Sequence, residues 1–209
     1  MIKKVLGTAV QVIEGLGGVV GVRAGTEEPH YLAEPLTDRV EIRSYGPRIA
    51  AETTVVADDE EARSTGFRRL AGYIFGGNSR QSKIAMTAPV GQQSEQIAMT
   101  APVAQSSTPD GASVIRFFMP AKWSLATLPT PCDDAVRLVE VPAETYAVLR
   151  FSGDRSPASV AARIEELSQT LREHGLQTSG EPVAWFYDPP WTLPFRRRNE
   201  VAVPINHTP

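Results

Sequence analysis

Apolar and polar positions alternate along the first half of the chain in a pattern typical of two strands followed by a helix. Residues 37–57 alternate around the turn signal Gly46-Pro47, which predicts a β-hairpin. The acids at 58–61 are typical of a helix's first turn, where the helix dipole stabilises negative charge. Residues 114–120 form a further predicted strand. Helical spacing predicts a core-facing stripe made of Phe67, Leu70, Ala71 and Ile74.

The second half repeats this order of elements. Residues 136–151 predict another hairpin, and Ser156-Pro157 is typical of the start of a helix. Strands are predicted at 182–187 and 199–204, joined by a proline-rich aromatic loop. The apolar stripe of the second helix consists of Val160, Ile164, Leu167 and Leu171.

The chain therefore divides into two similar halves, residues 38–120 and 134–205, within a domain of residues 31–209. Residues 1–30 are predicted as an N-terminal amphipathic helix and a linker. Helices segregated from mostly antiparallel strands define an α+β fold class. Two duplicated hairpin-helix-strand halves can merge their strands into one curved sheet or barrel. A cleft between helices and sheet is then a usual place for a small-molecule site.

A seven-residue segment occurs twice in the middle of the chain. Ile-Ala-Met-Thr-Ala-Pro-Val begins at Ile84 and again at Ile97. Each copy ends at a proline, which cannot donate to a central ladder, so each is predicted as a strand that ends at a bend or a sheet edge. The Ser/Thr/Pro/Gly-rich residues 104–112 are predicted as a mobile loop.

The N-terminal residues 1–25 begin with two lysines and a mostly apolar run, as a signal peptide does. Gln11 and Glu14 interrupt this run, and its apolar positions follow a helical stripe. We predict an amphipathic helix that docks on the domain or on a partner; the alternatives are a weak membrane anchor or an inefficient export signal. The expected location is the cytoplasm, or else a membrane surface reached through residues 3–22, or the periplasm.

Charge and residue counts exclude several function classes. The formal net charge of −3 argues against general nucleic-acid binding, which needs an excess of cations. The single Cys132 excludes an intramolecular disulfide. His30, His174 and His207 show no zinc-type spacing.

Several ordered motifs resemble the SOUL haem-binding family, over about residues 35–205. Val40-Glu41-Ile42-Arg43-Ser44-Tyr45-Gly46-Pro47 resembles its hairpin signature, and residues 66–78 resemble its first helix. Residues 83–90 are similar to its best-known motif, with the second copy a feature of bacterial members. Arg116-Phe117-Phe118-Met119-Pro120 resembles its following strand. The resemblance implies a distorted β-barrel flanked by two helices.

The same resemblance implies that haem, or another tetrapyrrole, binds non-covalently in a shallow apolar patch beside the first helix. Basic residues there would meet the propionates, because arginine can hold a carboxylate through two hydrogen bonds. The residues that match this description are Arg68, Arg69, Tyr73, Lys83, Met86 and Tyr45.

The chain departs from the family pattern at Ser44, where some members carry a histidine proposed as the axial iron ligand. Other side chains that can bind haem iron are His, Met, Cys and Tyr. The candidates that remain are Met86, Met99 and His174, and the sequence does not choose among them.

Three functions fit these observations. The first is a soluble, non-enzymatic protein that buffers or carries haem. The second is an enzyme acting on tetrapyrroles or small electrophiles in the same cleft, with a glutamate as general base. The third is a module that binds an apolar effector or a protein partner. The candidate bases lie on or beside predicted strands: Glu52, Glu144 and Glu200, the last expected at a solvent-facing strand edge.

Overall fold

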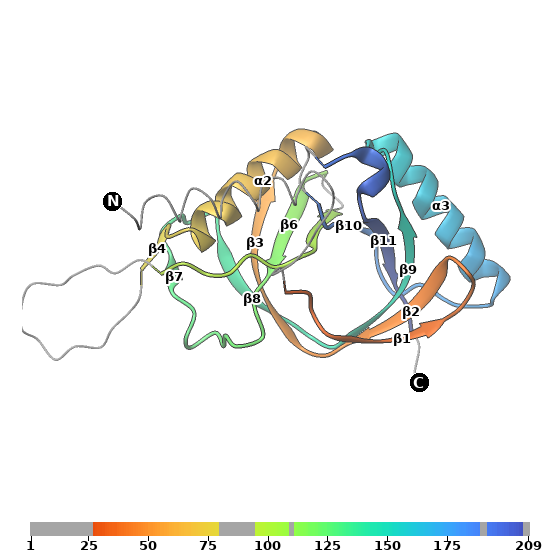
Figure 1. Cartoon of the computed structure of the whole chain (residues 1–209), viewed down its shortest axis with the longest axis horizontal. Helices are drawn as coiled ribbons and strands as arrows, with labels where there is room; N and C mark the ends of the chain where they lie inside the picture. Colours follow the sequence, from red (N-terminus) through yellow and green to blue (C-terminus); the bar gives the residue numbers. More distant parts are fainter. Residues whose placement is uncertain (1–26, 80–94, 109–110, 189–191, 207–209) are drawn as a thin grey trace, which may run out of the picture.

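The computed structural model describes residues 27–79, 95–108, 111–188 and 192–206. Within them the chain forms one curled antiparallel sheet of nine strands, with two main helices against one side (Figure 1). Helix α2 (Asp59–Ile74) packs on β3 and β6, and helix α3 (Pro157–Glu173) packs on β9 and β11. The strands of the sheet are β1 (Tyr31–Pro35), β2 (Val40–Tyr45), β3 (Arg48–Val55), β5 (Val103–Ser107), β6 (Ser113–Phe118), β8 (Arg137–Val141), β9 (Glu144–Phe151), β10 (Val183–Phe186) and β11 (Asn199–Pro204). The predicted α+β class with a distorted barrel is confirmed.

Three smaller elements complete the described part of the chain. Strands β4 (Asn78–Ser79) and β7 (Thr130–Pro131) pair with each other, and η1 (Pro194–Arg196) is one turn of 3₁₀ helix. The predicted N-terminal helix and the first Ile-Ala-Met-Thr-Ala-Pro-Val copy lie outside the described residues.

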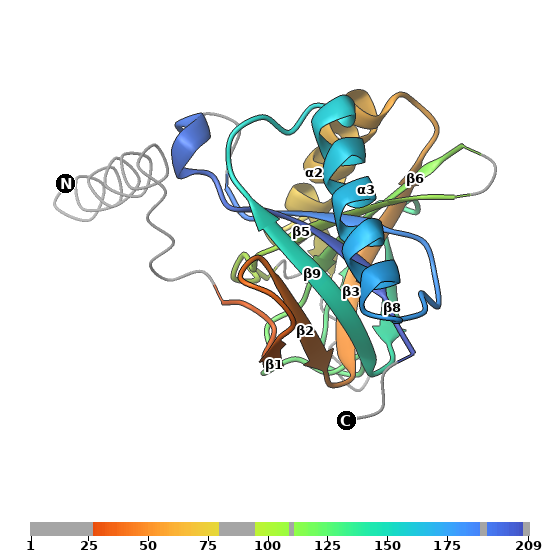
Figure 2. The same cartoon turned by 90° about the vertical axis from the view of Figure 1, so that its right-hand side faces the viewer.

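The strand order reveals an internal symmetry between the two halves. The sheet runs β1-β2-β9-β11-β10-β5-β6-β3-β8. The equivalent strands of the two halves are β2 and β8, β3 and β9, β5 and β10, and β6 and β11. If each strand is replaced by its equivalent, the order from β2 to β8 is the same sequence of strands read backwards. The helices follow the same exchange, because α2 lies on β3 and β6 as α3 lies on β9 and β11 (Figures 1 and 2).

The strands of each predicted hairpin lie where expected, but they do not pair with each other. Strand β2 pairs with β9, and β3 pairs with β8. The pairing keeps one register across the bend, since Tyr45 faces Glu144 and Arg48 faces Val141. Residues 40–55 and 137–151 are therefore two long bent ribbons, which pair with each other from Val40 opposite Leu149 to Glu52 opposite Arg137. This interlocking joins the two halves into one sheet.

The sheet buries a different apolar cluster on each face. Its inner face, opposite the helices, carries the aromatic side chains Tyr45, Tyr146 and Trp185. Under α2 the outer face buries Leu70 with Ile115 and Phe117; a third cluster lies under α3. Alternate residues of each strand therefore serve opposite faces, as the period of two requires.

Helix α2 starts and ends as its sequence predicts, but its buried side is rotated. The Asp58 side chain caps the first turn by accepting from the Glu60 and Glu61 N–H groups. Phe67, predicted in the core, is 38% exposed at the flank of the helix, which corrects that prediction. The buried residues of this helix are Ala62, Gly66, Leu70, Tyr73 and Ile74. The small Ala62 and Gly66 rather than Phe67 face the sheet because the helix approaches β6 closely.

Gly66 marks that close approach and gives a direct test of it. A Cβ at Gly66 would lie 2.3 Å from Ile115 Cγ1, and Ile115 is fully buried in β6. We expect Gly66→Ala to destabilise the fold by about 1–3 kcal/mol through overpacking. Gly72→Ala on the same helix is the control, because nothing lies within 4 Å of a Cβ there. It should stabilise by up to about 1 kcal/mol. Urea unfolding of both variants measures the difference; equal effects would contradict the close packing.

The second Ile-Ala-Met-Thr-Ala-Pro-Val copy is not the strand that was predicted. Only Val103 belongs to a strand, and Thr100 forms an isolated bridge with Glu27. Conversely, residues 104–107 of the predicted 104–112 loop belong to β5. Its polar residues are held by the fold: Gln105 is buried between β6 and β10, and its Nε2 donates to Asp59 O at 3.0 Å. Tertiary pairing therefore overrides the loop-like composition.

Candidate functional site

Helix α2 separates the side chains that the sequence grouped around haem. Because residues advance about 100° around a helix, Arg68 points away from the buried side and is exposed. Arg69 lies on the β3 flank, where its Nη1 donates to Thr53 Oγ1 at 3.3 Å. Tyr73 points inward, and its hydroxyl donates to Pro129 O at 2.9 Å. Burial raises the pKa of Tyr73 to about 12. These three side chains therefore face three different directions.

The other predicted ligand contacts are also dispersed. Tyr45 is buried on the inner face, with its ring edge-on to Tyr146 and Trp185 at 6.1 and 5.7 Å. Burial raises the pKa of Tyr45 to about 12. Lys83 and Met86 lie outside the described residues.

The remaining candidate iron ligands lie apart from each other. Met99 is 37% exposed in the irregular segment before β5. His174 caps the C-terminal end of α3, and its Nδ1 lies 2.9 Å from Thr170 O. The length of α3 puts it about 25 Å from the start of that helix. At the family histidine position, the Ser44 hydroxyl oxygen lies 3.3 Å from the Thr145 hydroxyl oxygen. In the described residues no three His, Cys, Asp or Glu side chains are grouped to hold a metal ion.

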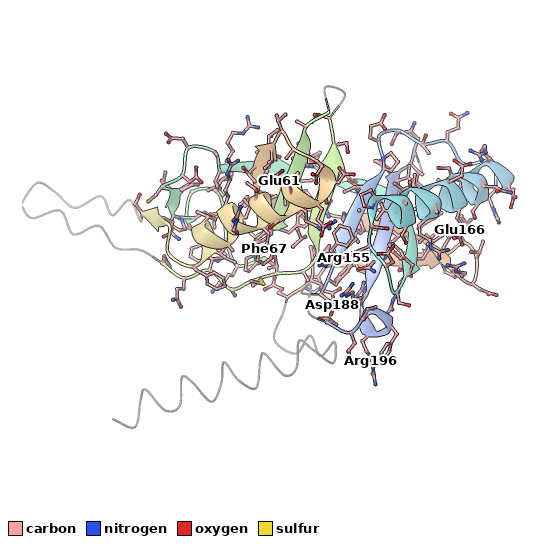
Figure 3. The ribbon with its side chains drawn as sticks, turned by 90° about the horizontal axis from the view of Figure 1, so that it is seen from above. Glu61, Phe67, Arg155, Glu166, Asp188 and Arg196 are labelled. Carbon is pink, nitrogen blue, oxygen red and sulfur yellow. The ribbon has the colours of Figure 1, made fainter. Side chains whose placement is uncertain are left out.

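The structure instead brings together four side chains on the outer face, which we call the outer patch: Arg63, Phe67, Arg155 and Phe186. Arg63 and Phe67 lie one turn apart on the flank of α2. The Arg63 and Arg155 guanidinium carbons lie 4.9 and 5.8 Å from the centre of the Phe186 ring. Figure 3 shows Phe67 and Arg155 on the same side of α2, with Glu61 on the other side.

The two arginines of the outer patch are not engaged in ion pairs. Neither forms an ion pair within the described residues, although Arg155 Nη1 donates to Asp188 O at 3.3 Å. Burial lowers the pKa of both. The pKa of Arg155 falls to about 10 through burial and the positive charges of Arg63 and Arg197. The carboxylates Asp59, Glu60 and Asp188 lie near enough to oppose this lowering in part, but burial and the like charges outweigh them. Two neighbouring cations that no ion pair engages favour an anionic ligand.

A small pocket and exposed apolar side chains lie next to these cations. A pocket of about 160 Å³ lies between the first turns of α2 and α3, and both arginines line it. The nearby η1 segment exposes Leu193 and Phe195 by 40% and 69%. It is tied to the loop before α3 because Gly153 N donates to Pro194 O at 2.9 Å.

Sequence reasoning could have found half of the outer patch. Arg63 and Phe67 are four residues apart, so a helical wheel with Phe67 on the flank would have paired them. Arg155 precedes the N-cap of α3, and only the folded chain brings it next to α2. Phe186 joins them from β10.

The inner face carries a buried ionic network centred on Glu200. Its carboxylate is fully buried, not at a solvent-facing edge as predicted. Arg43 donates to both Glu200 oxygens, at 2.6 and 2.9 Å. Arg198 Nε and the Tyr187 hydroxyl donate to it at 2.8 and 2.7 Å. Strand β11 is central in the sheet, which explains the burial.

The charges of this network hold each other in place. Burial opposes the charge on Glu200, but the hydrogen bonds and positive charge of Arg43, with Arg198, outweigh it and lower the Glu200 pKa. The pKa of Arg43 is raised because its bonds and attraction to Glu200 outweigh its burial. A carboxylate with a lowered pKa is a weak general base. We therefore interpret the network as structural and not catalytic.

The other two candidate bases are engaged as well. Glu52 accepts from Arg116 and Arg137 at 2.8 and 3.2 Å. Glu144 accepts from Arg48 at 2.8 Å. Each carboxylate thus has a cation partner, and none is paired with a nucleophile in the described part of the chain.

The described residues form an α+β domain, in which two helices and a curled sheet present a cationic and apolar surface. Residues 26–204 match the family model described as SOUL heme-binding protein. The chain belongs to the SOUL family. The recognition made from the sequence motifs is therefore confirmed.

Relatives and solved structures extend this result. The chain is 32% identical to heme-binding protein 2 of Mus musculus over 195 residues, which is 87% of this chain and 90% of that protein. It is 31% identical to heme-binding protein 2 of Homo sapiens over 144 residues, 68% of this chain and 66% of that protein. The crystal structure of the EcmrR C-terminal domain is similar with a TM-score of 0.55 at 10% identity, covering 85% of this chain and 99% of that one. That likeness concerns the fold alone.

The described helices are too short or too polar to cross a membrane.

Proposed function

We propose that this protein binds haem or a related tetrapyrrole on the outer patch, and that it buffers or carries the pigment. The main support for the proposal is the pair Arg63 and Arg155, two neighbouring cations that form no ion pair within the described residues of a SOUL family fold. Two propionates would supply the missing anions. Charge-assisted hydrogen bonds to carboxylates are stronger than neutral ones, and arginine can make two at once.

The apolar surroundings suit the macrocycle. Phe67 packs edge-on against Phe117 at 5.4 Å and remains partly exposed. Phe117 and Phe186 lie two strands apart through Val103, about 10 Å at the usual strand spacing. A flat ring laid across this surface would cover Phe67, while its carboxylates reach the pocket between the helices. Leu193 and Phe195 of η1 would border its far edge.

The outer patch contains no side chain that coordinates iron. We therefore infer that binding depends on the ring and the propionates, with little contribution from the metal. Arg68 and Arg69 remain the alternative anchors predicted by the sequence, on other sides of α2.

Titration with three pigments tests the proposal. Hemin should bind the purified protein with a shifted Soret band. Metal-free protoporphyrin should bind within about threefold of hemin, because iron is not needed. Hemin dimethyl ester, which has no anionic carboxylate, should bind at least about tenfold more weakly, the loss of roughly 1.4 kcal/mol. An absent Soret change, or equal binding of the ester, would contradict the proposal.

A further inference from the structure

A second, larger cavity lies at the opposite side of the sheet from the outer patch. Its volume is about 740 Å³, within the usual range for small-molecule sites. The bends of both long ribbons and the segment at 27–30 contribute to its wall. The cavity is lined by residues 27–30, 46–49, 118–121 and 140–142, together with Thr100 and Trp123.

The segment at 27–30 is held by contacts of its first two residues. Glu27 O accepts from Ala101 N at 3.0 Å, and Glu27 Oε1 accepts from Ala121 N at 2.7 Å. Glu28 pairs with Arg198 at 3.1 Å, which links the segment to the Glu200 network. The segment that forms one wall of this partly open cavity is therefore held in place by the fold.

Two buried donors in the cavity wall have no acceptor within the described residues: Arg48 Nε and Trp123 Nε1. The Arg48 side chain is 9% exposed and lies between the Tyr45 and Phe118 rings, at 4.3 and 4.6 Å from their centres. Its Nη2 pairs with Glu144 at 2.8 Å, which leaves Nε without a partner. Unsatisfied buried donors cost roughly 1–3 kcal/mol each, so a ligand that brings an acceptor is favoured.

The charges around the cavity argue against an anionic ligand. Glu27 and Glu140 line it without an ion pair in the described residues, whereas Arg198 balances Glu28 and Glu144 balances Arg48. The remaining wall is mostly apolar, with Ile49, Phe118, Met119 and Val141. Haem propionates would meet negative charge here, the reverse of the outer patch.

We propose that this cavity is a second binding site, for an uncharged apolar ring compound that carries a hydrogen-bond-accepting carbonyl oxygen. The ring would pack on Phe118 and Met119. A small movement of the Trp123 or Arg48 side chain would bring its buried, unpaired N–H to the carbonyl oxygen. The site is independent of haem binding, because none of its lining residues belongs to the outer patch.

Nile red, an uncharged ring compound with one carbonyl, is the probe, and equilibrium dialysis measures its binding. Ala121 is exposed and lines the cavity, so Ala121→Trp should fill the space and weaken binding at least about tenfold. Ala126→Trp, on the same loop but outside the cavity wall, is the matched control and should leave binding unchanged. Trp123→Phe removes one donor and should weaken binding several-fold.

Saturating hemin distinguishes the two sites. Hemin should not displace Nile red, and Ala121→Trp should bind hemin as the unmodified protein does. The proposal is overturned if the protein does not bind the dye, if both tryptophan variants lose it equally, or if hemin displaces it. Circular dichroism of each variant establishes that the fold is retained.

Discussion

Replacing Glu200 by Gln is expected to destabilise the protein by about 3–5 kcal/mol, the usual cost of removing one partner from a buried ion pair. The substitution keeps the size of the side chain but leaves Arg43 and Arg198 without their shared anion. Arg43 is 2% exposed, so water cannot replace the lost charge. Glu41 and Glu28 offer partial compensation from more exposed positions. Urea unfolding of the variant against the unmodified protein measures the loss.

Glu165→Gln is the matched control for this experiment. Glu165 pairs with Arg172 on the surface of α3, where the two side chains are 71% and 63% exposed. Removing that charge should change stability by less than about 1 kcal/mol, because exposed ion pairs contribute little. If both variants behave alike, the buried network does not hold the sheet together.

The same network predicts a defined pH dependence. The folded-state pKa of Glu200 lies below its ordinary value of 4.5, so its contribution is fully present above that value. It is lost as pH falls through the lower folded-state pKa. The stability gap between Glu200→Gln and the unmodified protein should therefore be constant near neutral pH and shrink below about pH 4. A gap that persists in acid would indicate a packing effect instead.

Local patterns predicted the positions of the elements well, because periodicity and caps depend on neighbouring residues. The N-cap Ser156 and the closing Gly175, with its positive φ of 69°, are examples. Strand pairing could not be predicted in the same way. Gly46-Pro47 suits a hairpin turn and also a bend in a continuing strand. The choice depends on Val141 and Glu144, about a hundred positions away, which meet the ribbon on both sides of the bend.

The candidate site shows the same limit. Glu200 follows Asn199 in a polar pair that looks like a strand edge, yet its strand is central and Arg43, 157 positions earlier, neutralises it. Arg155 looks like an ordinary loop cation until α3 places it beside Arg63. Charge partners set by tertiary contacts leave no trace in local spacing, so a sequence pattern identifies the family more readily than the ligand contacts.

Replacing Arg63 and Arg155 together by Ala is expected to weaken hemin binding by about tenfold or more. Each substitution would remove one charge-assisted contact to hemin. Such a contact is worth about 1.5–3 kcal/mol at most, and less at a half-exposed position. The control is Arg68→Ala with Arg69→Ala, which removes the same total charge, here from two neighbouring positions of α2. It should change hemin affinity by less than about threefold. The opposite ranking would support the anchors predicted by the sequence and refute the outer patch.

Stability gives this pair of variants a second, independent readout. If Arg63 and Arg155 were structural, removing them would lower the free energy of unfolding. Burial and the positive charges of Arg63 and Arg197 lower the Arg155 pKa, and neither arginine of the outer patch forms an ion pair in the described chain. The double variant should therefore unfold at the same or a higher urea concentration than the unmodified protein. Weaker hemin binding together with unchanged or higher stability is the result expected if the two charges serve ligand binding and destabilise the fold.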